Sequence, residues 1–136
     1  MNRSILAVDI GSSALKAVLF AVDGTVLAAR SAAISTTVGQ DRAHTQDPNH
    51  WWHAFKQARS ALPDGGEIQA VVFTGSMQNL IVLSPDGQPL APAALYSDRR
   101  LDEDEVADLE ARLPPDYAQR VGNRPDPAHT ILKLMR

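Results

Sequence analysis

The chain of 136 residues contains no cysteine. This absence excludes a disulfide framework, a thiolate metal site and a cysteine nucleophile, and it is compatible with a reducing compartment. Positive charge is also scarce: 13 lysines and arginines stand against 16 aspartates and glutamates, and the net charge is −3. Proteins that bind nucleic acid neutralise runs of phosphates with clustered Lys and Arg. We therefore expect no nucleic-acid partner.

Long apolar runs are missing as well. The first apolar run, residues 5–8, ends at Asp9 and is too short for a signal peptide. No segment approaches the roughly 20 apolar residues that cross a bilayer. The sequence thus predicts a cytoplasmic protein without a membrane partner. With 44% apolar and 21% charged residues, it is otherwise typical of a soluble globular domain.

The first third of the chain predicts β-structure followed by a helix. Apolar runs at 5–8 and 15–20 flank a turn-rich segment and predict a hairpin, and a turn at Asp23-Gly24 leads to a strand over 25–32. The domain would open with three antiparallel strands. The polar residues 36–48 predict a loop. The helix that begins at Asp47-Pro48 has apolar side chains at a period near 3.6 residues: Trp51, Trp52, Phe55, Ala58, Ala61 and Leu62.

The rest of the chain alternates between extended and helical patterns. Residues 68–75 are nearly all apolar, which predicts a strand covered on both faces with a parallel neighbour. A second hairpin is expected over 79–96, where prolines restrict the second arm. Residues 102–113 predict an amphipathic helix with an acidic first turn. Residues 128–136 have helical spacing without a stop signal, so we expect a partial domain that continues beyond this chain.

Residues 9–13, Asp-Ile-Gly-Ser-Ser, are the first candidates for chemistry. Gly11 would let a ligand approach the backbone, and the N–H groups of such a turn can point at phosphate oxygens. A carboxylate beside phosphates is repulsive unless a divalent cation lies between them, so Asp9 favours a metal–nucleotide ligand. An ordinary β-turn explains this segment equally well, and Lys16 alone is more typical of a solvent-facing strand residue.

Two further polar segments follow predicted strands. Residues 74–79 come after the apolar run 68–75, and ligands usually bind at the carboxyl ends of strands in open α/β sheets. Residues 96–100, Tyr-Ser-Asp-Arg-Arg, combine an aromatic face with one carboxylate and two cations, which suits a polyol or a sugar phosphate. The alternatives are a bare turn for the first segment and a solvated charge cluster for the second. His50 and His53 lack an acidic co-ligand, so zinc is not expected.

Taken together, four collinear segments resemble the FGGY family of carbohydrate kinases, nearest its xylulokinase branch. The resemblance covers residues 4–136. It implies an α/β, ribonuclease-H-like (actin-like ATPase) domain with a mixed sheet flanked by helices, and it implies ATP and Mg²⁺ as cofactors. The four segments are residues 9–16, similar to the first phosphate motif; 46–52, similar to Gln-Asp-Pro-x-x-Trp-Trp; 75–78, similar to Gly-Gln-Met-His; and 95–100, similar to Leu-Trp-x-Asp-x-Arg.

The resemblance assigns roles to individual residues. Asp9 would lie beside the metal and the phosphates, together with Gly11, Ser12, Ser13 and Lys16. The sugar would contact Met77, Gln78, Tyr96 and Asp98. Gln78 replaces the His of xylulokinases, and Tyr96 replaces the usual Trp. Because a glutamine can both donate and accept hydrogen bonds, a ketose such as xylulose or a polyol fits.

The resemblance also predicts what residues 1–136 lack. In the family, a downstream aspartate takes the proton of the attacking hydroxyl, and the second lobe holds the adenosine. The chain would then contain no catalytic residue of its own and be inactive alone. A non-catalytic sugar-binding or assembly module on the same fold is the alternative. A nuclease needs several carboxylates around two metals, and only Asp9 fits. The oligomeric state is left open, a homo-oligomer included.

Overall fold

The computed structural model describes residues 3–135, which form two compact units. The first unit contains residues 3–36 and 47–76, and the second contains residues 37–46 and 77–135. Each unit therefore combines two stretches of chain that are separated in the sequence.

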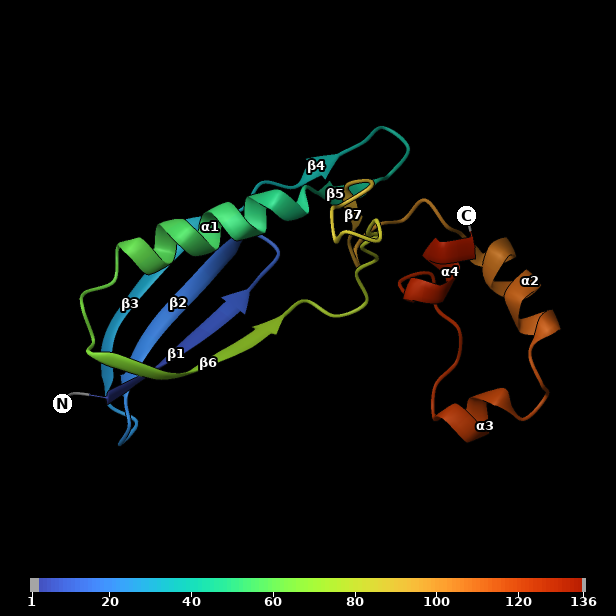
Figure 1. Ribbon diagram of the computed structural model, residues 1–136. Helices are drawn as coiled ribbons and strands as arrows, with labels where there is room; N and C mark the ends of the chain where they lie inside the picture. The colour runs from blue at the N-terminus through green and yellow to red at the C-terminus, as the bar shows by residue number, and fades with distance from the viewer. Residues whose placement is uncertain (1–2, 136) are drawn as a thin grey trace. The chain divides into compact units, whose positions relative to one another are not determined.

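The first unit is a four-stranded sheet with one long helix on it (Figure 1). The strand order is β3-β2-β1-β6. Strand β1 (Arg3–Ile10) pairs antiparallel with β2 (Ala14–Ala21), which pairs antiparallel with β3 (Val26–Ala33). Strand β6 (Glu67–Gly75) runs parallel to β1. The predicted antiparallel opening and the predicted parallel neighbour are both confirmed, and the sheet is mixed.

Helix α1 (Pro48–Ser60) begins where the sequence predicts. The side chain of Asp47 caps the helix by accepting a hydrogen bond from the backbone N–H of Asn49 at 2.9 Å. Pro48 occupies the first turn, where its missing N–H costs nothing and its fixed φ suits a helix. The helix packs over β2 and β3.

The core of the first unit lies between α1 and one face of the sheet. In β1 and β2, alternate residues are buried, as expected for strands with one covered face. Trp51 and Phe55 pack against this core, but Trp52 is 58% exposed and Ala61 is also exposed. Both were predicted to lie on the apolar face of the helix. The buried cluster is Leu6, Val8, Leu15, Ala17, Leu19, Ala32, Ile34, Ala54, Ala58 and Leu62.

The prediction that residues 68–75 are covered on both faces is wrong. The side chains of Val72 and Phe73 are 56% and 58% exposed, and β6 is exposed along nearly its whole length. Because β6 lies at the edge of this sheet and α1 packs mainly over β2 and β3, residues 3–135 offer it little cover. The predicted strand is therefore present as β6, but its apolar composition does not mean that its side chains are buried.

The second unit is built from short elements (Figure 1). Two short strands lie in the segment predicted as a loop over 36–48, and that part of the prediction is wrong. The hairpin predicted over 79–96 is reduced to two isolated bridges, Leu80 with Ala94 and Leu83 with Pro89, because proline cannot donate to a ladder. The elements are β4 (Thr37–Val38), β5 (His44–Gln46), β7 (Ala93–Ala94), α2 (Glu103–Arg112), α3 (Tyr117–Val121) and α4 (Thr130–Met135), with sheet order β4-β5-β7.

The helices predicted over 102–113 and 128–136 are confirmed as α2 and α4, although Arg136 lies outside the described residues. Helix α2 begins with a capping box: the side chain of Asp102 accepts from the backbone N–H of Asp104, and Glu105 accepts from the backbone N–H of Asp102. A small cluster of Leu101, Leu109 and Leu132 joins α2 to α4. Within residues 3–135, no helix is both long and apolar enough to cross a membrane.

Candidate functional site

The Asp-Ile-Gly-Ser-Ser segment forms the end of the first hairpin. The backbone N–H of Gly11 donates to the carbonyl of Ala14 at 3.1 Å, which closes the turn. A Cβ atom at position 11 would lie 2.9 Å from that carbonyl oxygen, so the tight turn requires a glycine. Ser12 and Ser13 are exposed at the tip. The turn therefore places two exposed serines at the end of the hairpin.

Asp9 lies directly opposite Lys16 on β2 and opposite Thr74 on β6. Residues that are paired in register on adjacent strands share one face of a sheet. This face is turned away from α1, because the alternating neighbours Val8 and Leu15 are buried in the core beneath that helix. Asp9 is half-buried and Lys16 is exposed. A carboxylate, an ammonium and a hydroxyl thus lie on the same open face, next to the glycine turn.

These groups fit a cation that is shared with phosphates. Mg²⁺ usually keeps several waters and takes one or two carboxylates together with substrate phosphate oxygens. Asp9 could supply one such carboxylate, and Lys16 on the neighbouring strand could supply a positive charge for a phosphate oxygen. Among residues 3–135, no cluster of three or more His, Cys, Asp or Glu side chains could hold a metal ion by itself. The donor set suits a metal–nucleotide complex better than a metal caged by protein.

Three of the four predicted sugar-contacting residues are exposed in the second unit. Met77 is 80% exposed, Tyr96 is 43% exposed, and Gln78 is exposed. The side-chain oxygen of Asn79 accepts a hydrogen bond from the backbone N–H of Tyr96 at 2.8 Å. This bond ties the turn that carries Gln78 to the segment that carries Tyr96. The structure therefore brings these two candidates into one region.

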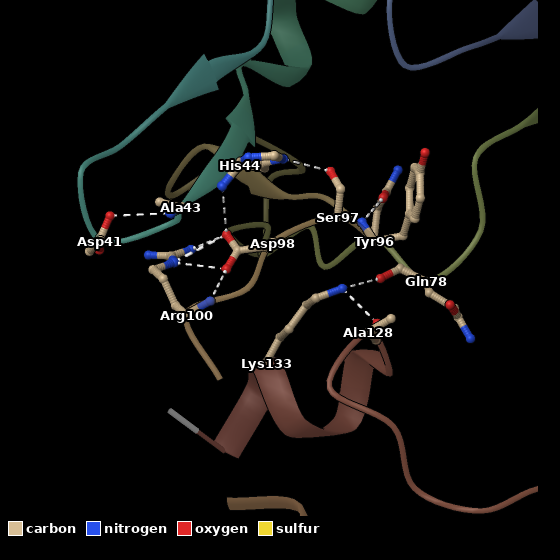
Figure 2. Close-up of polar contacts among 11 residues, drawn as sticks. Asp41, Ala43, His44, Gln78, Tyr96, Ser97, Asp98, Arg100, Ala128 and Lys133 are labelled. Carbon is tan, nitrogen blue, oxygen red and sulfur yellow. Dashed lines mark hydrogen bonds and ion pairs between the residues drawn. The ribbon is translucent and has the colours of Figure 1, made fainter. Parts of the chain in front are cut away.

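The fourth candidate, Asp98, is different because its side chain is buried. Its Oδ1 accepts from the backbone N–H and the Nε of Arg100 at 3.2 and 3.0 Å. Its Oδ2 accepts from Nη2 of Arg100 at 2.8 Å and from the backbone N–H of His44 at 3.2 Å (Figure 2). Burial acts to raise the pKa of Asp98, but these hydrogen bonds and the charge of Arg100 outweigh it and lower the pKa. Asp98 is therefore ionised, with both oxygens already engaged by the protein.

Asp98 also lines a pocket of about 400 Å³ in the second unit. Apolar side chains, including Leu80, Val82 and Leu101, form much of the wall, and the charged groups Asp98, Arg100 and Lys133 complete it. An ion pair in such a wall can orient polar ligands or support neighbouring residues.

Sequence reasoning did not predict the supporting role of three residues in this region. His44 binds Asp98 through its backbone, and its ring Nδ1 lies 3.0 Å from the Oγ of Ser97. Asn79 holds Tyr96, as described above. The ammonium of Lys133 donates to the carbonyls of Gln78 and Ala128, both at 2.7 Å. The only sequence signal for Lys133 is a lysine within an apolar helical stretch. Asn79 falls within the polar segment 74–79 singled out above, whereas nothing in the sequence signals His44.

The predicted residues thus form two groups. The nucleotide and metal candidates are in the first unit: Asp9, Gly11, Ser12, Ser13 and Lys16. The sugar candidates are in the second unit: Met77, Gln78, Tyr96 and Asp98.

Known proteins similar in sequence agree on one family. A model of the N-terminal domain of the FGGY family of carbohydrate kinases matches residues 4–135. The xylulose kinase of Escherichia coli K12 is 32% identical over 133 residues, which is 96% of this chain and 27% of that protein. The xylulose kinase of Streptomyces coelicolor is 31% identical over 138 residues, covering 95% of this chain and 27% of that protein. The chain therefore spans about a quarter of the length of these relatives.

Solved structures confirm the predicted fold. The crystal structure of a xyloylose kinase from Brucella ovis matches with a TM-score of 0.86 and 27% identity, covering 96% of this chain and 28% of that chain. A Plasmodium falciparum glycerol kinase with ADP matches with a TM-score of 0.83 over 98% of this chain and 28% of that chain, and its 15% identity shows the fold alone. The fold is the predicted ribonuclease-H-like (actin-like ATPase) α/β fold with a mixed sheet. The chain belongs to the FGGY family of carbohydrate kinases and matches the family's N-terminal domain.

Proposed function

We propose that residues 1–136 are the partial N-terminal domain of an ATP-dependent sugar kinase, without the second ATP-binding lobe. The complete protein would phosphorylate a hydroxyl group of a ketose similar to xylulose, or of a polyol. Family membership supports this proposal, as do relatives named xylulose kinase. The single observation that carries it is the register of β1 and β2, which places Asp9 opposite Lys16 beside the glycine turn. A cytoplasmic location follows from the proposed use of ATP.

In this proposal, the first unit binds the phosphates. Asp9 would hold Mg²⁺, which when bound neutralises negative charge on the phosphate oxygens. Lys16 and the hydroxyls of Ser12 and Ser13 would bind oxygens of the transferred phosphoryl group, and the N–H groups of the turn at Gly11 would add further donors. Such groups act by positioning and by charge stabilisation rather than by covalent chemistry.

The second unit would bind the sugar. The amide of Gln78 can donate to one hydroxyl and accept from another. The ring of Tyr96 offers an apolar face for C–H groups, and the exposed side chain of Met77 can pack beside it. Asp98 would take part in sugar binding in one of two ways. Its remaining lone pairs could accept a hydrogen bond from a sugar hydroxyl, or it could hold the guanidinium of Arg100 in place.

The proposed phosphoryl transfer needs a base for the hydroxyl proton, and that base is not among residues 1–136. The sugar hydroxyl oxygen forms a bond to the γ-phosphorus of ATP, and the bond from that phosphorus to the oxygen bridging the β-phosphate breaks. ADP leaves, and the hydroxyl proton goes to a base, which family resemblance places downstream of residue 136. We therefore propose that residues 1–136 alone do not catalyse the transfer.

The test is ADP release by the full-length protein over a panel of ketoses and polyols, including xylulose and glycerol. We expect at least one sugar to stimulate ADP release about tenfold or more over the rate without sugar, and residues 1–136 alone to release none. If no sugar stimulates the full-length protein, the kinase proposal fails. Sugar binding without ADP release would favour a non-catalytic module instead.

A further inference from the structure

The turn at Gln78 has a backbone conformation that needs support. Gln78 has a φ of +62°, in the left-handed region that residues other than glycine rarely adopt. Such a conformation costs about 1 kcal/mol and persists where surrounding contacts hold it. Because the direction of the Gln78 side chain depends on this conformation, the contacts that fix the turn also fix the proposed sugar-reading amide.

One side of the turn is tied to the segment before Asp98. Leu80 and Ala94 exchange two backbone hydrogen bonds of 2.9 and 3.0 Å. Asn79 accepts from the backbone N–H of Tyr96 at 2.8 Å. These bonds hold the residues that follow Gln78, but they do not hold the peptide group of Gln78 itself.

Lys133 supplies that contact from α4. Its side chain is only 9% exposed, and its ammonium donates to the carbonyl of Gln78 at 2.7 Å. A second bond of 2.7 Å goes to the carbonyl of Ala128, which fixes the ammonium in place (Figure 2). Hydrogen bonds from a charged donor are roughly twice as strong as neutral ones. Figure 2 shows the Gln78 carbonyl facing Lys133 while the Gln78 side chain points away from it.

The electrostatic setting is consistent with a retained charge. Burial lowers the pKa of Lys133, and the charge of Arg99 acts in the same direction. The carboxylates of Asp98 and Asp126 oppose this shift. An ammonium placed against two carbonyl oxygens near these carboxylates is therefore a structural cation and not an exposed surface charge.

We propose that Lys133 is a positioning residue for sugar recognition: by holding the carbonyl of Gln78, it directs the Gln78 amide toward the sugar without touching the sugar itself. This inference rests on the proposed function, because it gives the turn at Gln78 the role of reading hydroxyl groups. It also connects helix α4 to the sugar-binding part of the second unit.

The main test replaces Lys133 by methionine in the full-length protein. Lys133→Met keeps most of the aliphatic stem but removes the ammonium and its two hydrogen bonds, so the Gln78 carbonyl loses its side-chain donor. We expect the KM for the sugar to rise about tenfold, with kcat and the KM for ATP changed less than about twofold. Lys133→Arg, which keeps the charge and the donors, should restore part of the affinity. Lys56→Met is the matched control, because Lys56 is an exposed lysine on α1.

A double-mutant cycle separates positioning from a purely structural role. If Lys133 acts through Gln78, Lys133→Met should add less than about twofold to the sugar KM of a Gln78→Ala protein. A purely structural role would instead lower the fraction of active enzyme and leave the sugar KM unchanged. Additive effects of the two substitutions, or an unchanged sugar KM in Lys133→Met, would overturn the inference. If Lys133→Met does not fold, Lys133→Gln takes its place in the cycle.

A readout without catalysis keeps this test separate from the proposed function. If the wild-type protein shows no sugar-stimulated ADP release, the kinase proposal fails, and hydrogen exchange decides the role of Lys133 in the turn. The backbone N–H of Leu80, which donates to Ala94, should then exchange at least about tenfold faster in Lys133→Met than in Lys56→Met. Equal exchange rates would show that Lys133 does not hold the turn.

Discussion

The two units of the chain support their candidate site residues in different ways. In the first unit, Asp9 and Lys16 stand on long paired strands whose other face covers the apolar core under α1. In the second unit, Gln78 and Tyr96 stand on short segments held by side-chain hydrogen bonds to the backbone. The apolar cluster of the second unit has only three buried leucines among the described residues.

The two kinds of support predict different responses to substitution. Burial in a large core is collective and non-directional, so its loss destabilises a whole sheet. A hydrogen bond between a side chain and the backbone is directional, so its loss frees one particular turn. We therefore expect core substitutions in the first unit to act globally and substitutions of these hydrogen-bonded side chains in the second unit to act locally.

The largest effect on stability should come from the core of the first unit. Leu15 is fully buried at 0% exposure, and Leu15→Ala should lower the free energy of opening of the β1 and β2 amides by about 3 kcal/mol. Val71→Ala on the exposed strand β6 is the control and should cost less than about 1 kcal/mol. Native-state hydrogen exchange of the full-length protein measures both. Equal losses in the two variants would show that the core is not where we describe it.

A smaller and more local effect is expected at the buried ion pair of the second unit. Asp98→Asn keeps the side-chain shape but leaves the guanidinium of Arg100 without its carboxylate, which should cost about 2 kcal/mol. Hydrogen exchange should rise at the amides of His44 and Arg100, which donate to Asp98, and remain unchanged in β1 and β2. Asp86→Asn on an exposed turn serves as control. If amides in both units lost protection from exchange, the predicted distinction between local and global responses would be contradicted.

The same carboxylate should make the second unit sensitive to acid. Because the pKa of Asp98 is lowered in the folded state, its carboxylate stabilises the fold fully above the unfolded pKa, and this stability is lost as the pH falls below about 4. The protection of the amides of His44 and Arg100 should therefore decrease from pH 5 to pH 3 after correction for intrinsic exchange. The decrease should be weaker in Asp98→Asn. An identical pH profile in both proteins would argue that other groups, such as Asp23 or Asp86, control acid unfolding.

The smallest effect is expected at the start of α2. Asp102→Ala removes the capping box and should destabilise this helix by about 1 kcal/mol. Asp108→Ala, at an exposed position in the middle of the same helix, is the matched control and should cost less. Amide exchange along α2 measures the difference. Equal exchange in the two variants would mean that the cap does not stabilise α2.

Local patterns predicted the elements that depend on local physics. The hairpin of β1 and β2, the strand β3 and the starts of α1 and α2 follow from apolar alternation, turn residues and helix-start residues. The burial of β6 was predicted wrongly, because burial depends on what packs against a strand and not on its composition. The short strands β4 and β5 were missed, because a strand of two or three residues is too short to carry a periodic signal.

The candidate site shows the same division. The sequence could mark Asp9 and Lys16 as neighbours of a turn, but the hairpin register is what sets them directly opposite each other. Sequence patterns could also mark Gln78 and Tyr96. The ties made by Lys133 and Asn79 could not be predicted, because their partners are backbone atoms far away in the sequence. The sequence could likewise not predict that both carboxylate oxygens of Asp98 accept hydrogen bonds from His44 and Arg100.

The central claim assigns the holding of Mg²⁺ beside the phosphates to Asp9 and the recognition of sugar hydroxyls to Gln78, and one paired measurement tests it most directly. In the full-length protein, the sugar Kd and kcat are measured for Asp9→Asn and Gln78→Ala side by side. We expect Asp9→Asn to lose about 10³-fold in kcat with its sugar Kd changed less than twofold, and Gln78→Ala to weaken sugar binding about tenfold with its KM for ATP unchanged. Normal turnover by Asp9→Asn, or loss of the same parameter in both variants, would contradict the account.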